Sequence, residues 1–124
     1  MSARIFSVGI VTLALTGCGP DYERTEITGI VPSPLGGEIN FQHVYVPQGM
    51  PLKAHIVSLN DDNKLMDGQI RTSDPTIMDV IQGVGDRDFA FLGMKAGRTQ
   101  IEIRADGELV LVLDAVVTEQ PAAP

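Results

Sequence analysis

Apolar and polar residues alternate over short stretches along most of this chain. Residues 52–56 place leucine, alanine and isoleucine at every second position with lysine and histidine between them, and residues 99–104 alternate in the same way. This is the pattern of a strand with one buried face. Residues that form turns separate the runs at short intervals, so no run is long enough for a typical helix. The pattern predicts an all-β domain over residues 39–119.

The expected strands lie at 39–46, 52–56, 66–72, 79–82 and 88–92, followed by a final hairpin. In the first strand the alternation slips by one position around Gln42 and His43, which predicts a bulge or bend there. Pro75 begins a stretch that could form a single helical turn, capped by Asp74 or Ser73. With the hairpin, these elements predict a β-sandwich of about seven strands.

The alternation also predicts which side chains form the core. The second strand should bury its three apolar residues and expose Lys53 and His55. Across the domain, the residues expected in the core are Ile56, Ile70, Val80, Phe91, Ile101, Ile103, Leu109 and Leu111.

Two registers are open for the final hairpin. A two-residue turn at Asp106 and Gly107 would place the leucines of the last strand on its polar face. A three-residue loop that also includes Ala105 reverses them, and we expect this register because it makes one continuous apolar face. It pairs Ile103 with Leu109, Ile101 with Leu111, and Arg98 with Asp114. It also turns Val110 and Val112 outward, which makes them the candidate docking face for a partner strand.

The N-terminus has the organisation of a signal peptide. Arg4 precedes a short apolar run from Ile5 to Leu15, which is too short to span a membrane. The next residues complete a Leu-Thr-Gly-Cys sequence that ends at Cys18 and resembles the bacterial lipobox. The resemblance implies cleavage after residue 17 and modification of Cys18 by lipid, palmitate included. The alternative is an ordinary secretory signal with an incidental cysteine.

The segments that flank the domain differ from it in composition. Residues 18–38 are rich in proline, glycine and charged residues, and we expect them to be a flexible tether, with a possible short edge strand from Thr25 to Val31. Residues 120–124 are expected to be a disordered tail.

Charge and cysteine content narrow the possible functions. The net charge is −7, so the protein is repelled by phosphate backbones, and nucleic acid is not an expected partner. Cys18 is the only cysteine. If it carries lipid, the domain has no disulfide, no thiol nucleophile and no thiolate metal ligand. More than one acyl chain would anchor the protein stably at a membrane.

The middle of the chain resembles a known family. The residues that carry the resemblance are a strand ending in Ser-Asp-Pro, a later valine, a Lys-Ala-Gly turn and an alternating Thr-x-Ile-x-Ile strand: Ser73, Asp74, Pro75, Val80, Lys95, Ala96, Gly97, Thr99, Ile101 and Ile103. They resemble the group 2 bacterial immunoglobulin-like domains of invasin- and intimin-type surface proteins, many of which have a tryptophan where this chain has Ile70. The resemblance implies an immunoglobulin-like β-sandwich.

A second resemblance covers nearly the same residues. The residues Asp74-Pro75, Asp79-Val80, Leu92-Gly93 and Gly97-Arg98-Thr99 are similar to the small N-terminal β-domain of pilus and secretion-channel secretins. Both comparisons imply an all-β sandwich. They differ in what the protein would accompany in the cell envelope.

Few residues offer chemistry. His43 and His55 are the two histidines, and they lack the spacing of a zinc site. No nucleophile elbow or phosphate-binding loop is present in the sequence. Asp61, Asp62 and Asp67 are the best candidates for a calcium site, although their spacing does not match the EF-hand pattern. We therefore expect no enzymatic activity, no cofactor and no metal.

These observations predict a lipid-anchored protein of the cell envelope, held at the outer membrane. It would act as a non-enzymatic module for protein interaction, adhesion or structure. The alternative is an accessory lipoprotein of a secretin-based pilus or secretion system.

Overall fold

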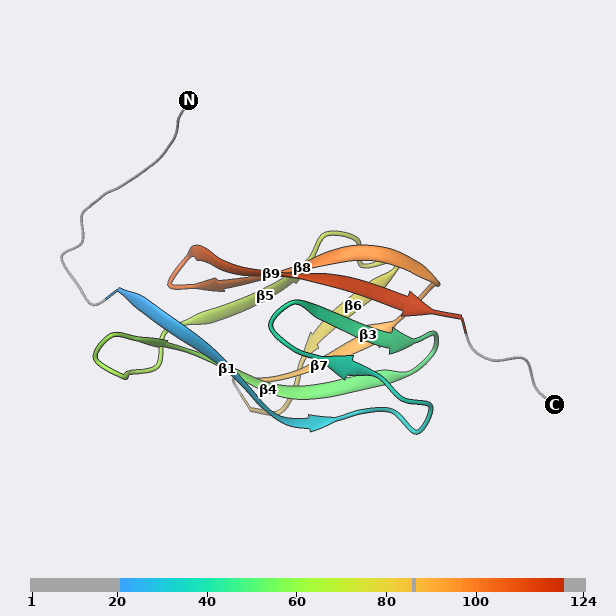
Figure 1. Ribbon diagram of the computed structural model, residues 1–124, viewed down its shortest axis with the longest axis horizontal. Coiled ribbons are helices and arrows are strands. Elements are labelled where there is room, and N and C mark those ends of the chain that lie inside the picture. Colours follow the sequence, from blue (N-terminus) through green and yellow to red (C-terminus); the bar gives the residue numbers. More distant parts are fainter. Residues whose placement is uncertain (1–20, 86, 120–124) are drawn as a thin grey trace, which may run out of the picture.

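The computed structural model describes residues 21–85 and 87–119. These residues form nine strands arranged in two sheets. The strands are β1 Tyr22–Val31, β2 Glu38–Ile39, β3 His43–Pro47, β4 Pro51–Asn60, β5 Gly68–Thr72, β6 Met78–Gln82, β7 Asp88–Gly93, β8 Gly97–Ala105 and β9 Glu108–Thr118. Figure 1 shows that β1 begins at one end of the sandwich and β9 stops at the other.

The two sheets have the connectivity of an immunoglobulin-like sandwich. One sheet has four strands in the order β1-β4-β7-β6, and the other has five in the order β2-β3-β9-β8-β5. All neighbouring strands are antiparallel except β3 and β9, which run parallel. The predicted fold class, an all-β sandwich, is therefore confirmed. The structure has more strands than expected because β1 and β2 extend it on the N-terminal side.

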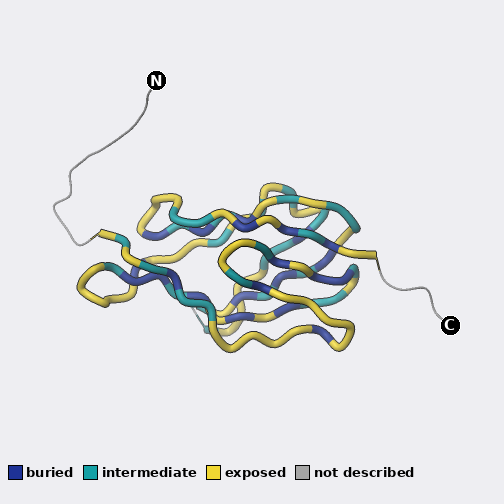
Figure 2. The backbone as a smooth tube through the Cα atoms, viewed as in Figure 1, coloured by how far each residue is buried: buried dark blue, intermediate teal, exposed yellow. Residues whose placement is uncertain are grey.

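The core lies between the sheets and is built from alternate positions of the strands. Figure 2 shows buried positions recurring along the strands, while the exposed positions gather in the loops. The largest fully buried side chains are Phe91, Leu52, Met78, Ile101, Ile103, Leu113, Val44 and Val46. The prediction for β4 is confirmed, since Leu52, Ala54 and Ile56 are buried and Lys53 and His55 are exposed.

Most of the predicted core residues lie where we expected them. Ile56, Phe91, Ile101 and Ile103 are buried. Ile70, Val80 and Leu111 are half-buried and pack against the core. The prediction is wrong for Leu109, which is 47% exposed.

The first correction concerns the predicted tether. Residues Tyr22–Val31 form a ten-residue strand that pairs with nearly the full length of β4. Thr25 anchors it: its side chain is buried, and its hydroxyl lies 3.0 Å from that of Ser58 and 2.9 Å from that of Tyr22. The polar composition of this strand suggested flexible chain, but backbone pairing and this hydroxyl cluster stabilise it as an edge strand.

The second correction concerns residues 39–46, which were expected to form one bent strand. They form two strands, β2 and β3, joined by a tight turn and paired antiparallel with Ile39 opposite Val44. Asn40 forms the turn, because its side-chain oxygen accepts hydrogen bonds from the backbone N–H groups of Gln42 and His43 at 2.8 and 2.9 Å. The slip in the alternation was therefore the sign of a turn, of the kind that asparagine favours.

The third correction concerns the hairpin of β8 and β9. Asp106 and Gly107 form a two-residue turn in which both φ angles are positive, 49° and 88°. Such a turn suits the twist of a hairpin, and the Asp-Gly pair favours it. A bulge at Val110 then shifts the register, so that Ile103 faces Leu111 and Ile101 faces Leu113. The apolar face is continuous as predicted, but the bulge in β9 produces it rather than a longer loop.

Two smaller predictions concern local contacts. Arg98 and Asp114 form an ion pair at 3.1 Å as expected, but the predicted register is wrong, because Arg98 lies opposite Val116 and reaches Asp114 diagonally. The segment after Ser73 forms a single turn in which the backbone N–H groups of Ile77 and Met78 donate to the carbonyl of Asp74. The Asp74 carboxylate caps it by accepting from the N–H of Thr76 at 3.0 Å.

Candidate functional site

The histidine on β3 has a structural role. His43 stacks on the ring of Tyr45, with ring centroids 4.2 Å apart and an angle of 8° between the planes. Its Nε2 lies 3.1 Å from the side-chain nitrogen of Asn40 and also contacts the carboxylate of Glu38. All of these contacts lie within residues 38–45, so they hold the β2–β3 turn together.

The second histidine pairs with a carboxylate but has no nucleophile. His55 on β4 contacts Asp88 on β7 through Nδ1 at 2.8 Å. The serine hydroxyls are used elsewhere, since Ser58 pairs with Thr25 and Ser33 donates to the carbonyl of Gly36 at 2.6 Å. Within residues 21–85 and 87–119, no hydrogen bond joins a serine hydroxyl to a histidine ring, so these residues do not form the arrangement of a Ser-His-Asp triad.

The candidate calcium ligands do not converge. Asp61 and Asp62 lie in the loop after β4, where the backbone of Asp61 bonds to that of Asp21. Asp67 instead contacts Asp106 at the tip of the β8–β9 hairpin, each donating its backbone N–H to the other residue at 2.8 Å. Over the described part of the chain, no three His, Cys, Asp or Glu residues gather to hold a metal ion.

The predicted lipid site cannot be placed in this structure. Cys18 and the signal peptide lie outside the described residues. Among the residues that the structure describes, no helix is long and apolar enough to span a membrane.

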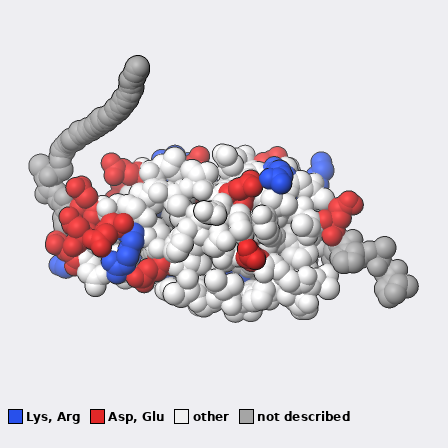
Figure 3. All heavy atoms as spheres, viewed as in Figure 1, with Lys and Arg blue, Asp and Glu red and all other residues white. Residues whose placement is uncertain are grey.

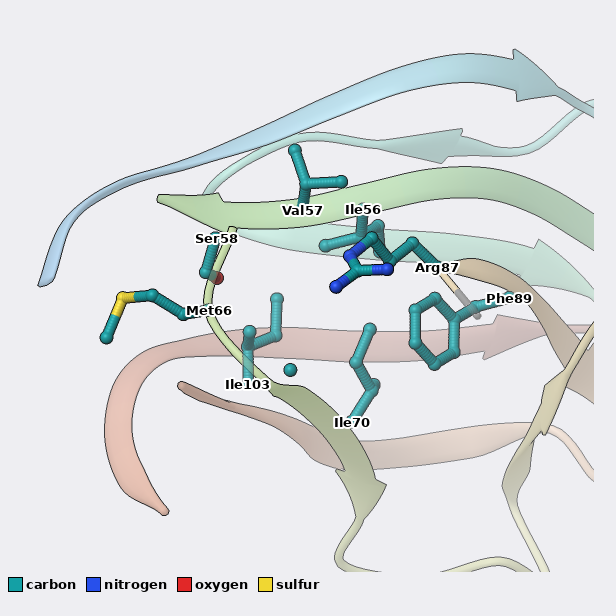
Figure 4. A pocket seen from close by; sticks show the side chains of 9 residues that line it. Ile56, Val57, Ser58, Met66, Ile70, Arg87, Phe89 and Ile103 are labelled. Atoms are coloured by element: carbon teal, nitrogen blue, oxygen red, sulfur yellow. The ribbon is translucent and has the colours of Figure 1, made fainter. Parts of the chain in front are cut away.

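The hollows of the domain differ in character. A small cavity of about 10 Å³ inside the sandwich has room for roughly one water molecule. Figure 4 shows the guanidinium of Arg87 directed into it from beside Phe89. A second hollow of about 390 Å³ lies between the edges of β5 and β6, lined by Gln69, Arg71 and Gln82 among others. A third, of about 360 Å³, lies on the outer face of the four-stranded sheet, and its lining is mostly apolar.

Charge is unevenly distributed over the surface. In Figure 3 acidic side chains gather at the end of the molecule where β1 begins, while the centre of the face in view is mostly uncharged. Two charge pairs lie on the outer face of the five-stranded sheet, Arg98 with Asp114 and Arg104 with Glu102, both at 3.1 Å.

The two valines of the predicted docking face do not both point outward. Val112 points outward on β9 and is 40% exposed, as expected. Val110 is the extra residue of the bulge, and it is half-buried and packs against the core. The bulge therefore separates the two valines that a regular hairpin would have placed side by side.

An apolar row that the sequence did not suggest crosses the outer face of the four-stranded sheet. The register places Val31 opposite Lys53, Lys53 opposite Ala90, and Ala90 opposite Ile81, so one residue from each strand lies in the row. Val31 is 57% exposed and Ile81 is 46% exposed. Because pairing of four separate strands assembles the row, the only local signal in the sequence was the apolar pair Ile30-Val31 ahead of a proline-rich loop.

Comparison with known proteins identifies the fold. No protein-family model and no curated protein sequence matches this chain. Domains 4 and 5 of the S-layer protein SbsC superpose with a TM-score of 0.56 at 12% identity, covering 92% of this chain and 55% of that one. A six-domain structure of the same protein gives a TM-score of 0.59 at 13% identity, covering 91% of this chain and 14% of that one. The chain thus spans about half or less of these neighbours, and the likeness establishes a β-sandwich domain.

Proposed function

We propose that this protein is a lipid-anchored module of the cell envelope, held at the outer membrane through Cys18, with a structural or protein-binding role and no catalytic one. The lipobox-like sequence that ends at Cys18 carries the proposal. The structural neighbours are described as surface-layer proteins, which supports a structural role at a cell surface. The Ser-Asp-Pro and Lys-Ala-Gly motifs support a relationship to the group 2 bacterial immunoglobulin-like domains.

The position of β1 determines how such an anchor would hold the domain. The strand begins at Tyr22, four residues after Cys18. Four residues reach at most about 14 Å even when fully extended. A lipidated Cys18 would therefore keep the domain against the membrane, rather than standing off on the long tether that composition suggested.

The end of the domain that would face the lipid is acidic. Asp21 and Glu23 lie at the start of β1, and the backbone contact between Asp21 and Asp61 brings the loop after β4 to the same end. Carboxylates are repelled by anionic headgroups. The domain would therefore rest on the anchor alone, without binding its acidic end to the membrane surface.

Lipid labelling tests the proposal. Cells given a palmitate analogue should label the natural chain, and Cys18→Ala should abolish the label and shift the protein from the detergent phase to the aqueous phase. Ser33→Ala, a change in the described domain, is the matched control and should keep both properties. A Cys18→Ala chain that remains in the detergent phase would show that a lipid on Cys18 does not anchor the protein.

A further inference from the structure

The outer face of the four-stranded sheet carries an open, apolar hollow. Its lining includes Val31 on β1, Lys53 on β4, Ala90 on β7 and Val84 in the loop between β6 and β7. Val84 is fully exposed, and Val31 and Ile81 are about half exposed. A loop valine with no cover and a row of exposed apolar residues on one face are unusual on a small acidic domain, and such surfaces mark interaction sites.

A bulge in β1 shapes the hollow. The pairing of β1 with β4 shifts between Thr28 and Val31, and Gly29 there has a φ of 58°. The bulge leaves the end of β1 beside Lys53, and Gly29 and the exposed Val31 line the hollow there. Bulges at sheet edges commonly redirect side chains next to functional sites.

One cation lies at the centre of this apolar row. Within residues 21–85 and 87–119, Lys53 has no carboxylate within 4.0 Å. Asp88 is the nearby acid in the hollow, and its carboxylate is engaged by His55 at 2.8 Å. The hollow therefore offers an ammonium group that can donate hydrogen bonds to a carboxylate of a partner. The apolar side chains around it can bury the residues next to that carboxylate.

We propose that this hollow binds an extended segment of a protein partner in which a carboxylate is flanked by apolar side chains. The carboxylate would pair with Lys53, and the apolar side chains would pack on Val31, Ile81 and Val84. Charge complementarity selects this chemistry, because Lys53 is the charged residue in the row of Val31, Ala90 and Ile81 and forms no ion pair within residues 21–85 and 87–119. The proposal deepens the protein-binding role proposed above and rests on it.

A second copy of the chain fits less well. Each copy carries a net charge of −7, so two copies repel each other. Like charges of this kind oppose association. Self-association is therefore one of the outcomes that the test must separate.

The test uses two synthetic peptides of defined sequence. One is acetyl-Gly-Val-Leu-Asp-Leu-Val-Gly-amide, and the other replaces the aspartate with asparagine. Each is titrated into the full chain in detergent while backbone amide shifts are followed by NMR. We expect the aspartate peptide to shift the amide signals of residues 30–31, 53, 84 and 90, and to bind about threefold more tightly than the asparagine peptide, since a single exposed charge pair is commonly worth a few-fold in affinity.

Variants show whether the binding depends on this site. Lys53→Met keeps the apolar stem and should reduce binding of the aspartate peptide to the level of the asparagine peptide. Lys64→Met, a change of the same kind in the loop after β4, should leave binding unchanged. Val84→Ser should lower the affinity for both peptides by a similar factor, because it removes apolar contact and leaves the charge pair in place.

Several results would overturn the proposal. These are equal affinities for the two peptides, no binding at millimolar peptide, equal losses for Lys53→Met and Lys64→Met, or shifts at residues 30–31 and 53 that depend on protein concentration and so indicate a second copy. The Cys18→Ala chain is titrated in parallel. Binding by that chain combined with failure of lipid labelling in the natural one would reject the anchor while keeping the site.

Discussion

Ile101 on β8 is fully buried at the middle of the core, between Leu113 on β9 and Thr72 on β5. Its truncation leaves a cavity that the surrounding strands can fill only in part. We predict that Ile101→Ala lowers the free energy of unfolding by about 2 to 5 kcal/mol. Urea denaturation followed by circular dichroism measures the change.

Val112 provides the matched control because it lies on the same hairpin with its side chain pointing outward. Val112→Ala should change the free energy of unfolding by no more than about 0.5 kcal/mol. Equal effects of the two substitutions would show that the assignment of inner and outer faces in the β8–β9 hairpin is wrong.

Asp74 accepts two hydrogen bonds from Thr76, from the hydroxyl at 2.6 Å and from the backbone N–H at 3.0 Å. The side-chain bond is the main reason that the pKa of Asp74 is lowered below its ordinary 3.8, with the backbone bond next and a smaller contribution from Lys95. Because the folded pKa is lowered, the carboxylate stabilises the fold above about pH 4. This contribution is lost as the pH falls through the folded pKa.

Thr76→Val removes the hydroxyl donor and keeps a β-branched side chain. We predict that the pKa of Asp74 then rises toward 3.8, measured by following its side-chain carboxyl carbon by NMR as the pH is lowered. Thr118→Val at the end of β9 should leave that titration unchanged. An unchanged pKa in Thr76→Val would mean that the turn is held by backbone contacts alone.

Strands in which apolar and polar residues alternate were predicted well from the sequence. β4 and β8 are examples, since residues 52–56 and 100–105 alternate between buried and more exposed positions. β1 was predicted only in part, as a possible short edge strand from Thr25 to Val31, because its stability comes from its partner: Thr25 is polar, and only its contact with Ser58 explains why it is buried. The bulge at Val110 was missed for the same reason, because a register shift depends on two strands at once.

The end of β7 passes very close to the end of β3. A Cβ atom placed on Gly93 would lie 2.5 Å from the carbonyl oxygen of Pro47 and 3.1 Å from a methyl group of Val117. The backbone oxygen cannot move away cheaply, because β3 is paired with β9 on its other side. Gly93 is therefore required where the two sheets approach each other.

We predict that Gly93→Ala lowers the free energy of unfolding by about 1 to 3 kcal/mol, as overpacking commonly does. Gly68→Ala on β5 is the control, because a Cβ there meets nothing closer than 3.9 Å. Thermal unfolding of both variants should separate them clearly. If Gly93→Ala and Gly68→Ala have the same melting temperature, then β3 and β7 lie farther apart than the structure places them.

The candidate binding site was beyond the reach of sequence analysis. Its row takes one residue from each of four strands, and the residues lie as far apart in the chain as Val31 and Ala90. The exposure of Lys53 was predicted correctly, but alternation says nothing about which residues stand beside it. The prediction that Val110 and Val112 form a docking face was wrong for Val110, because it assumed a hairpin without a bulge.

The proposed anchor would place the N-terminal end of the domain at the membrane. β1 begins there, acidic side chains gather there, and β9 leaves the sandwich at the opposite end (Figures 1 and 3). With an anchor at Cys18, the long axis would stand away from the lipid and the outer face of the four-stranded sheet would be open to a partner from the side. Anchor and binding face would thus act without competing for the same surface.

Intact-mass spectrometry of the protein extracted from its native membranes tests the anchor most directly. A lipid anchor at Cys18 predicts a chain that begins at this residue and carries diacylglycerol on the thiol and an acyl group on the new amine. A chain that begins at any other residue, or one in which the thiol of Cys18 is unmodified, would contradict it.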